Sequence, residues 1–140
     1  MPPISIKFCN FAAWCIHILM GKVVILGASS NPDRYSYQAA RLLSEKGYDF
    51  EPVGLRPGLS GGRKILIIRK YPPIHDVDTI TLYMNPVNQR EYYEYIIGMK
   101  PGRIIFNPGT ENEDLAALAA KSSIKTLENC TLVMLRTGTF

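Results

Sequence analysis

Short runs of apolar and β-branched residues alternate along most of this chain with longer amphipathic stretches. Such runs, closed by glycine or proline, are typical of strands buried on both faces of a parallel sheet. The pattern predicts strands over residues 22–26, 48–53, 65–68, 77–83, 103–106 and 124–127. Because amphipathic stretches separate the strands, we predict right-handed βαβ units and an α/β fold with a doubly wound parallel sheet of about five strands, covered by helices to give three layers.

Capping residues indicate where the helices begin and end. A helix is predicted from Ser36 to Lys46, before Gly47. Asn85 and Pro86 have the residue types of an N-cap and a first helical position, and that helix is expected to continue to residue 99. Residues 110–113 have the form of a capping box for a helix through Leu115, Leu118 and Ala119, and residues 130–135 are expected as a closing segment for which a helix is one interpretation.

The first 19 residues precede this pattern. They include most of an apolar run from Phe11 to Met20 that is too short to span a bilayer, with only Lys7 as a cation before it and no cleavage motif. We therefore expect residues 1–19 to be an N-terminal extension outside the core, and residues 20–140 to form one domain. An additional structural element and a targeting segment are the alternatives for this extension.

Composition narrows the class of protein. Apolar residues make up 46% of the chain and charged residues 20%, as in ordinary globular domains. A net charge of +4 favours small anionic ligands but falls short of the dense basic stripe of a nucleic-acid binder. The three cysteines are an odd number without C-x-x-C spacing, which favours a reducing, cytoplasmic compartment. We expect neither a nucleic-acid nor a membrane partner.

The loop after the first strand is the strongest candidate for binding a ligand, because open α/β sheets bind ligands beyond the carboxyl ends of their strands. It reads Gly27-Ala28-Ser29-Ser30-Asn31-Pro32, and its small side chains let backbone N–H groups approach a phosphate, with Arg34 nearby. The loop lacks the later glycines of G-x-G-x-x-G, which disfavours NAD. The 106–112 loop leads instead into three acidic residues that would repel a phosphate. An ordinary tight turn is the alternative for the first loop.

The second strand ends near Arg56, where proteins that bind NAD usually carry an acidic residue. An arginine at this place suits a phosphorylated ribose, which occurs in both NADP and coenzyme A. Arg63 and Lys64 are weaker candidates for the same role. A solvated loop charge is the alternative for Arg56.

No residues in the predicted domain suggest catalysis or metal binding. Cys130 is the only cysteine there and has no visible base beside it, so a buried structural role is favoured. Tyr92, Ile96 and Met99 are predicted to face inward, with Tyr93 and Tyr95 half exposed. A homodimer contact or a contact with a partner protein through these tyrosines stays open.

From Met20 to Phe140 the chain resembles the small stand-alone CoA-binding proteins, whose fold is similar to the nucleotide domain of succinyl-CoA ligase α subunits. The resemblance lies in residues 27–37, 77–83, 106–112 and 130–135. It implies a Rossmann-like fold with the first loop at the pyrophosphate of coenzyme A, the end of the second strand near the adenosine, and the other two loops lining the pocket. The loop over residues 58–64 is richer in glycine than the family pattern.

Taken together, these observations predict a protein that binds coenzyme A or an acyl-CoA without evident catalysis of its own. The resemblance supplies no reaction, because the ligases use a phosphorylated histidine on a further domain and an ATP-grasp partner. An NADP-binding reductase or redox-sensing domain is the alternative, and a scaffold that has lost its ligand is a third reading. The candidate cofactor-binding residues are Gly27, Ala28, Ser29, Ser30, Asn31, Pro32, Arg34, Tyr35, Arg56, Tyr83, Asn85, Pro86, Asn107, Pro108 and Gly109.

Overall fold

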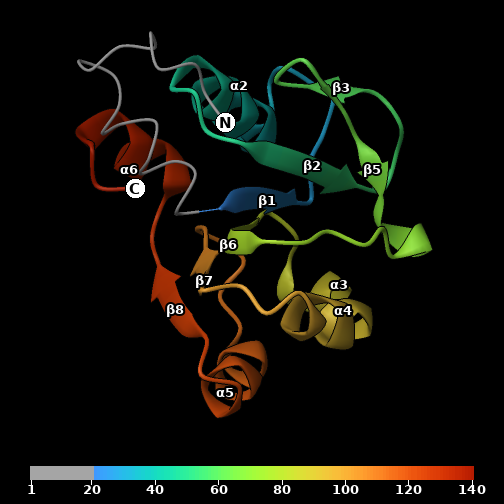
Figure 1. Cartoon of the computed structure of the whole chain (residues 1–140), viewed down its shortest axis with the longest axis vertical. Coiled ribbons are helices and arrows are strands. Elements are labelled where there is room, and N and C mark those ends of the chain that lie inside the picture. The colour runs from blue at the N-terminus through green and yellow to red at the C-terminus, as the bar shows by residue number, and fades with distance from the viewer. Residues whose placement is uncertain (1–20) are drawn as a thin grey trace, which may run out of the picture.

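A parallel sheet runs through the middle of the molecule (Figure 1). The structure is a computed structural model that describes residues 21–140, and the prediction for residues 1–19 lies outside this part. The sheet has six strands in the order β5-β2-β1-β6-β7-β8, and every neighbouring pair is parallel. This confirms the Rossmann-like α/β fold, and the six strands correspond to the six predicted segments, although the sheet was expected to have about five. The strands are β1 (Lys22–Leu26), β2 (Phe50–Gly54), β5 (Leu66–Ile67), β6 (Val77–Leu82), β7 (Arg103–Phe106) and β8 (Lys125–Glu128).

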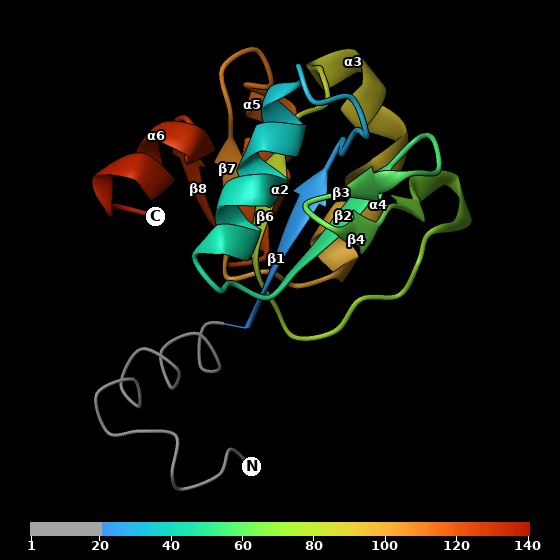
Figure 2. The same cartoon turned by 90° about the horizontal axis from the view of Figure 1, so that it is seen from above.

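Helices cover both faces of the sheet, which gives three layers (Figure 2). One face carries α2 (Tyr35–Glu45) and α6 (Thr131–Thr137), and the other carries α3 (Pro86–Gln89), α4 (Tyr93–Gly98) and α5 (Glu113–Lys121). Successive strand residues point to opposite faces. Val24 and Leu26 therefore belong to the larger apolar cluster, whereas Val23 and Ile25 belong to the cluster beneath α2. Within residues 21–140 no helix is long and apolar enough to cross a membrane.

The helix predicted from residue 86 to residue 99 is interrupted. A 3-10 turn over Arg90–Tyr92 separates α3 from α4. Because residues three apart eclipse in a 3-10 turn, this tightening puts Gln89 and Tyr92 on the same inner face, where both are buried. Tyr92 and Ile96 face inward as predicted, while Met99 is only partly buried against the core.

The capping box predicted for residues 110–113 does not form. Asn112 is the N-cap of α5, and its Oδ1 accepts a hydrogen bond from the backbone N–H of Leu115 at 3.1 Å. Thr110 instead donates its hydroxyl to the carbonyl of Asn107 at 2.8 Å. The helix therefore begins at Glu113, and its cap is Asn112, not Thr110 as the sequence pattern predicts.

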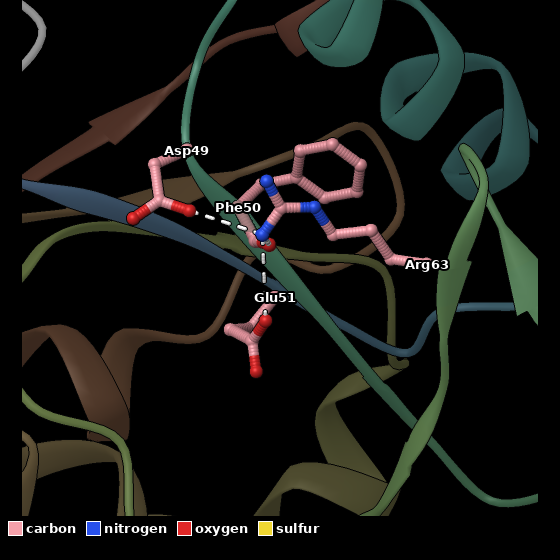
Figure 3. A network of polar contacts seen from close by, with 4 residues as sticks. All are labelled: Asp49, Phe50, Glu51 and Arg63. Carbon is pink, nitrogen blue, oxygen red and sulfur yellow. Dashed lines mark hydrogen bonds and ion pairs between the residues drawn. The ribbon is translucent and has the colours of Figure 1, made fainter.

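A small hairpin of β3 (Leu59–Ser60) and β4 (Arg63–Lys64) lies outside the main sheet and was not predicted. Its two-residue turn is Gly61-Gly62, with φ of +61° and +80°, as the tight hairpin turns require. Arg63 fastens the hairpin to β2 (Figure 3). Its Nη1 donates to Asp49 Oδ1 at 3.0 Å and to the Phe50 carbonyl at 2.8 Å, and its guanidinium lies 4.8 Å from the centre of the Phe50 ring.

Candidate functional site

An open cleft of about 810 Å³ lies beyond the carboxyl ends of the central strands. The chain order reverses at β1, because β2 lies on one side of it and β6 on the other. Such a reversal is where open α/β sheets bind ligands, since the loops diverge there and leave a crevice. The loops after β1, β2, β6 and β7 all contribute to the cleft.

The cleft brings together most of the residues predicted from the sequence. Those that line it are Gly27, Ala28, Ser29, Ser30, Asn31, Arg34, Tyr35, Arg56, Tyr83, Asn85 and Pro108. Four predicted residues are not among its lining, namely Pro32, Pro86, Asn107 and Gly109. The lining also includes residues that we did not predict: Asp33, Ser36, Gly54, Leu55, Ile68, Met84, Asn88 and Thr110. Most of these are sequence neighbours of predicted residues. Ile68 directly follows β5 and could have been found by applying the strand-end rule to that strand. Ligand contact by any of them stays a prediction.

The loop after β1 is held by its own side chains. Ser29 Oγ accepts from the backbone N–H of Asn31 at 3.0 Å, and Asn31 Oδ1 accepts from the N–H of Asp33 at 3.0 Å. The N–H of Arg34 donates to the carbonyl of Asn31 at 3.0 Å. These turns fix the path of the chain into α2, so the start of that helix has a defined place at the cleft.

The N-terminus of α2 has no cap from a side chain and no acidic residue in its first turn. Tyr35 and Ser36 in this turn line the cleft. The first N–H groups of a helix have no partner within the helix, and the helix dipole is positive at this end. The start of α2 can therefore bind an anion such as a phosphate.

Two other helices that begin beside the cleft are capped by the chain itself. In α3, Asn85 Oδ1 accepts from the N–H of Asn88 at 2.9 Å. In α5, the cap from Asn112 is reinforced by Glu113 and Asp114 in the first turn. Both termini are less suited to an anion than the start of α2.

Two arginines line the cleft, and a third candidate is engaged elsewhere. Arg34 and Arg56 belong to the lining, and Arg56 is exposed and forms no ion pair within residues 21–140. Arg63 is occupied by Asp49, Phe50 and Glu51, the last at 3.6 Å (Figure 3). Neither Arg63 nor Lys64 lines the cleft, so Arg56 is the candidate cation after β2 that lies at the cleft.

Gly27 is required by a neighbouring loop of the protein. Its φ is +100°, and a Cβ there would lie 3.0 Å from the carbonyl carbon of Tyr83 and 3.1 Å from Met84 Cγ. We expected this glycine to serve the approach of a ligand. The structure shows that the close approach of the loop after β6 already demands it.

Asn107 lies beneath the cleft and ties three elements together. It is 3% exposed, and its Nδ2 donates to Thr81 Oγ1 at 2.7 Å and to the carbonyl of Leu82 at 2.8 Å. Its Oδ1 accepts from the backbone N–H of Thr131 at 2.8 Å. Asn107 thus joins β6, β7 and α6, and the next residue, Pro108, is the one that reaches the cleft.

Tyr83 lines the cleft, but its hydroxyl is buried without a hydrogen bond of good geometry. The hydroxyls of Thr131 and Thr81 lie nearby. Burial is the main cause that raises the pKa of Tyr83 to about 12, and these two hydroxyls offset only part of it. The phenol is therefore neutral at physiological pH.

Nothing in the described residues assembles a metal centre. Within residues 21–140 no group of three or more His, Cys, Asp and Glu side chains could hold a metal ion. Cys130 is a half-buried free thiol at the N-cap of α6 and does not line the cleft.

Solved structures of similar fold are known. A protein described only as uncharacterized is 48% identical to this chain, and the likeness covers 86% of this chain and 98% of the other with a TM-score of 0.81. A protein from Thermus thermophilus is 16% identical over 94% of this chain and 98% of its own, with a TM-score of 0.77. A hypothetical protein from Pyrococcus horikoshii OT3 is 22% identical over 99% of this chain and 96% of its own, with a TM-score of 0.72. The last two likenesses concern the fold alone.

No curated protein matches the chain. The sequence pattern of the CoA binding domain matches residues 21–136, which includes all four loops of the cleft. The chain therefore belongs to the CoA-binding domain family.

Proposed function

We propose that this protein binds coenzyme A or an acyl-CoA in the cleft, without evident catalysis of its own. The observation that carries the proposal is the start of α2, which has no side-chain cap and no acidic residue in its first turn, and whose residues line the cleft. In a member of the CoA-binding domain family, this is the natural place for the pyrophosphate of coenzyme A.

The other cleft residues support one orientation of the ligand. With the pyrophosphate over Ser30 and the first turn of α2, the ribose 3′-phosphate meets Arg56 at the end of β2. Leu55 and Ile68 offer apolar surface to the adenine on the same side. The pantetheine arm then runs along the opposite side, between the loops after β6 and β7.

The same arginine would also suit the 2′-phosphate of NADP. Coenzyme A is favoured because the first loop, Gly27-Ala28-Ser29-Ser30-Asn31-Pro32, lacks the later glycines of the dinucleotide motif, and because of the family. We place this function in the cytoplasm, since an odd number of cysteines suits a reducing compartment.

Thermal unfolding with a set of matched ligands tests the proposal. At one hundred times the dissociation constant, a ligand that binds only the folded state stabilises it by about 2.7 kcal/mol, which a melting curve resolves readily. We expect coenzyme A to raise the melting temperature most, dephospho-CoA less, and NADPH less than coenzyme A. A melting curve that millimolar coenzyme A leaves unchanged and NADPH raises would overturn the proposal in favour of an NADP-binding domain.

A further inference from the structure

Gln89, the last residue of α3, is fully buried next to two loops that line the cleft. Its Nε2 donates to the carbonyl of Met84 at 2.8 Å and to the carbonyl of Thr110 at 2.9 Å. Its Oε1 accepts from Asn112 Nδ2 at 2.9 Å. A single planar amide thus joins the loop after β6 to the loop after β7.

Met84, in the loop after β6, and Thr110, in the loop after β7, both line the cleft. The register between β6 and β7 ends at the pair Leu82 and Phe106, so the loops leave the sheet there. Asn107 joins them at this level through its bond to the Leu82 carbonyl. Further along both loops, the amide of Gln89 bridges them.

We propose that Gln89 is a positioning residue for the ligand, which holds the loops of Met84 and Thr110 in the relative position that accepts the pantetheine arm of coenzyme A. This inference rests on the function proposed above. Gln89 is not itself part of the cleft lining. It acts through the two residues whose carbonyl groups it binds.

The arrangement requires an amide, because two donors and one acceptor are needed on one side chain. A carboxylate in its place would turn acceptor oxygens toward the carbonyl groups of Met84 and Thr110. Burial and these oxygens would raise the pKa of a glutamic acid at this position. Once protonated, the acid would regain one donor and therefore one of the two bonds. In Gln89→Glu the bond between the two loops should therefore be weaker at high pH than at low pH.

Titration calorimetry of coenzyme A with wild type and Gln89→Glu at pH 6 and pH 8 tests the proposal. We expect the dissociation constant of Gln89→Glu to exceed that of wild type by about tenfold at pH 8 and by about two- to threefold at pH 6, as for the loss and partial recovery of a buried hydrogen bond. Because both proteins are measured with the same ligand at each pH, the effect of the ligand's own phosphate groups cancels in the ratio of the two dissociation constants.

Asn129→Asp is the matched control. It makes the same change from amide to carboxylate at an exposed position that does not line the cleft. Asn129 uses its Oδ1 to accept from the N–H of Cys130 at 2.8 Å, and a carboxylate can do the same. The ratio of its dissociation constant for coenzyme A to that of wild type should stay near one at both pH values.

The outcomes separate a positioning role from a merely structural one. If Gln89→Glu melts at a lower temperature than wild type, but the ratio of its dissociation constant to that of wild type stays near one at both pH 6 and pH 8, the proposal is overturned. If Gln89→Glu does not fold, Gln89→Asn decides, because the shorter amide reaches only one carbonyl and should weaken binding by about fivefold at both pH values. Wild-type affinity in Gln89→Asn overturns the inference, whereas a wild-type protein that binds no coenzyme A overturns the proposed function and the inference with it.

Discussion

Gly58, at the base of the β3–β4 hairpin, lies directly against Ser30 in the loop after β1. A Cβ at Gly58 would be 2.7 Å from Ser30 Cβ and 3.0 Å from its Oγ. The carbonyl of Gly58 accepts from the N–H of Ile65 at 2.8 Å, which closes the base of the hairpin. The loop after β2 therefore forms the back of the loop after β1, and the hairpin supports the proposed pyrophosphate site.

Gly58→Ala should disturb the first loop. The new methyl group would meet Ser30, and the φ of +148° is strained for a residue with a side chain. We expect a loss of stability of about 1–3 kcal/mol from the strained backbone. We also expect coenzyme A to bind about tenfold more weakly, equivalent to about 1.4 kcal/mol. Chemical denaturation and calorimetry measure the two effects.

Gly62→Ala is the control for this change. Gly62 also has a positive φ, +80°, but a Cβ there meets nothing within 4 Å. It should lose stability and keep its affinity. Equal affinity in both variants would show that the hairpin does not shape the first loop.

Arg56 is predicted to contact the ribose phosphate. Arg56→Ala, or the removal of that phosphate in dephospho-CoA, should weaken binding by about ten- to one-hundredfold, and the two losses should not add because they remove the same contact. Arg41→Ala is the control, since Arg41 is an exposed arginine of α2 that pairs with Glu45 at 4.0 Å and does not line the cleft. It should cost at most about 0.5 kcal/mol of stability and leave affinity unchanged. If the losses from Arg56→Ala and from dephospho-CoA add, Arg56 does not contact the ribose phosphate.

Tyr83→Phe should not destabilise the protein at neutral pH, because the hydroxyl it removes is buried without a good hydrogen bond. A gain of up to about 1 kcal/mol is expected. Folding raises the pKa of Tyr83 from 10.0 to about 12. Ionisation of this phenol therefore leaves the free energy of unfolding unchanged below pH 10 and lowers it as the pH rises toward 12.

Urea unfolding at pH 7 and pH 11 measures this effect. The stability of Tyr83→Phe should fall less between the two pH values than that of wild type. Part of the fall should persist, because burial also raises the pKa of Tyr95 to about 12. An equal fall in both proteins would contradict the role of Tyr83.

Gly27→Ala should affect folding as well as binding. Its Cβ would press on the backbone of Tyr83 and Met84 at 3.0–3.1 Å, and the φ of +100° would be strained. We expect a loss of about 1–3 kcal/mol in the free energy of unfolding. The same stability as wild type in chemical denaturation would show that the β6 loop can yield to the methyl group.

The local sequence pattern was enough to predict the layers and the main strands. Apolar runs such as Lys22–Leu26 indicate strands because they are short, rich in β-branched residues and followed by a glycine. The hairpin escaped notice because each of its strands has only two residues, although Gly61-Gly62 is a recognisable turn. The cap of α5 was misplaced because Thr110 and Asn112 are both good N-caps. The bond from the Leu115 N–H to Asn112 and the bond from Thr110 to Asn107 decide between them.

The site could be predicted as a set of loops but not as a set of contacts. The strand-end rule identified the loop after β1 and Arg56, which line the cleft. It could not distinguish Asn107, which points into the core, from Pro108, which reaches the cleft. Gln89 was not predicted because nothing in the neighbouring sequence indicates that a polar residue of this short helix is buried. Two of its partners, Thr110 and Asn112, come from a loop that is distant in the sequence.

The pairing of β1 with β6, two strands far apart in the sequence, also has a kinetic consequence. The cleft lies where these strands and β2 end, so it exists only after a large loop of chain has closed. Folding that depends on such distant pairings is slow compared with that of helical bundles of similar size. A transition state that has not yet assembled all four loops offers coenzyme A no complete site. The ligand should then prolong the lifetime of the native state and leave the refolding rate almost unchanged.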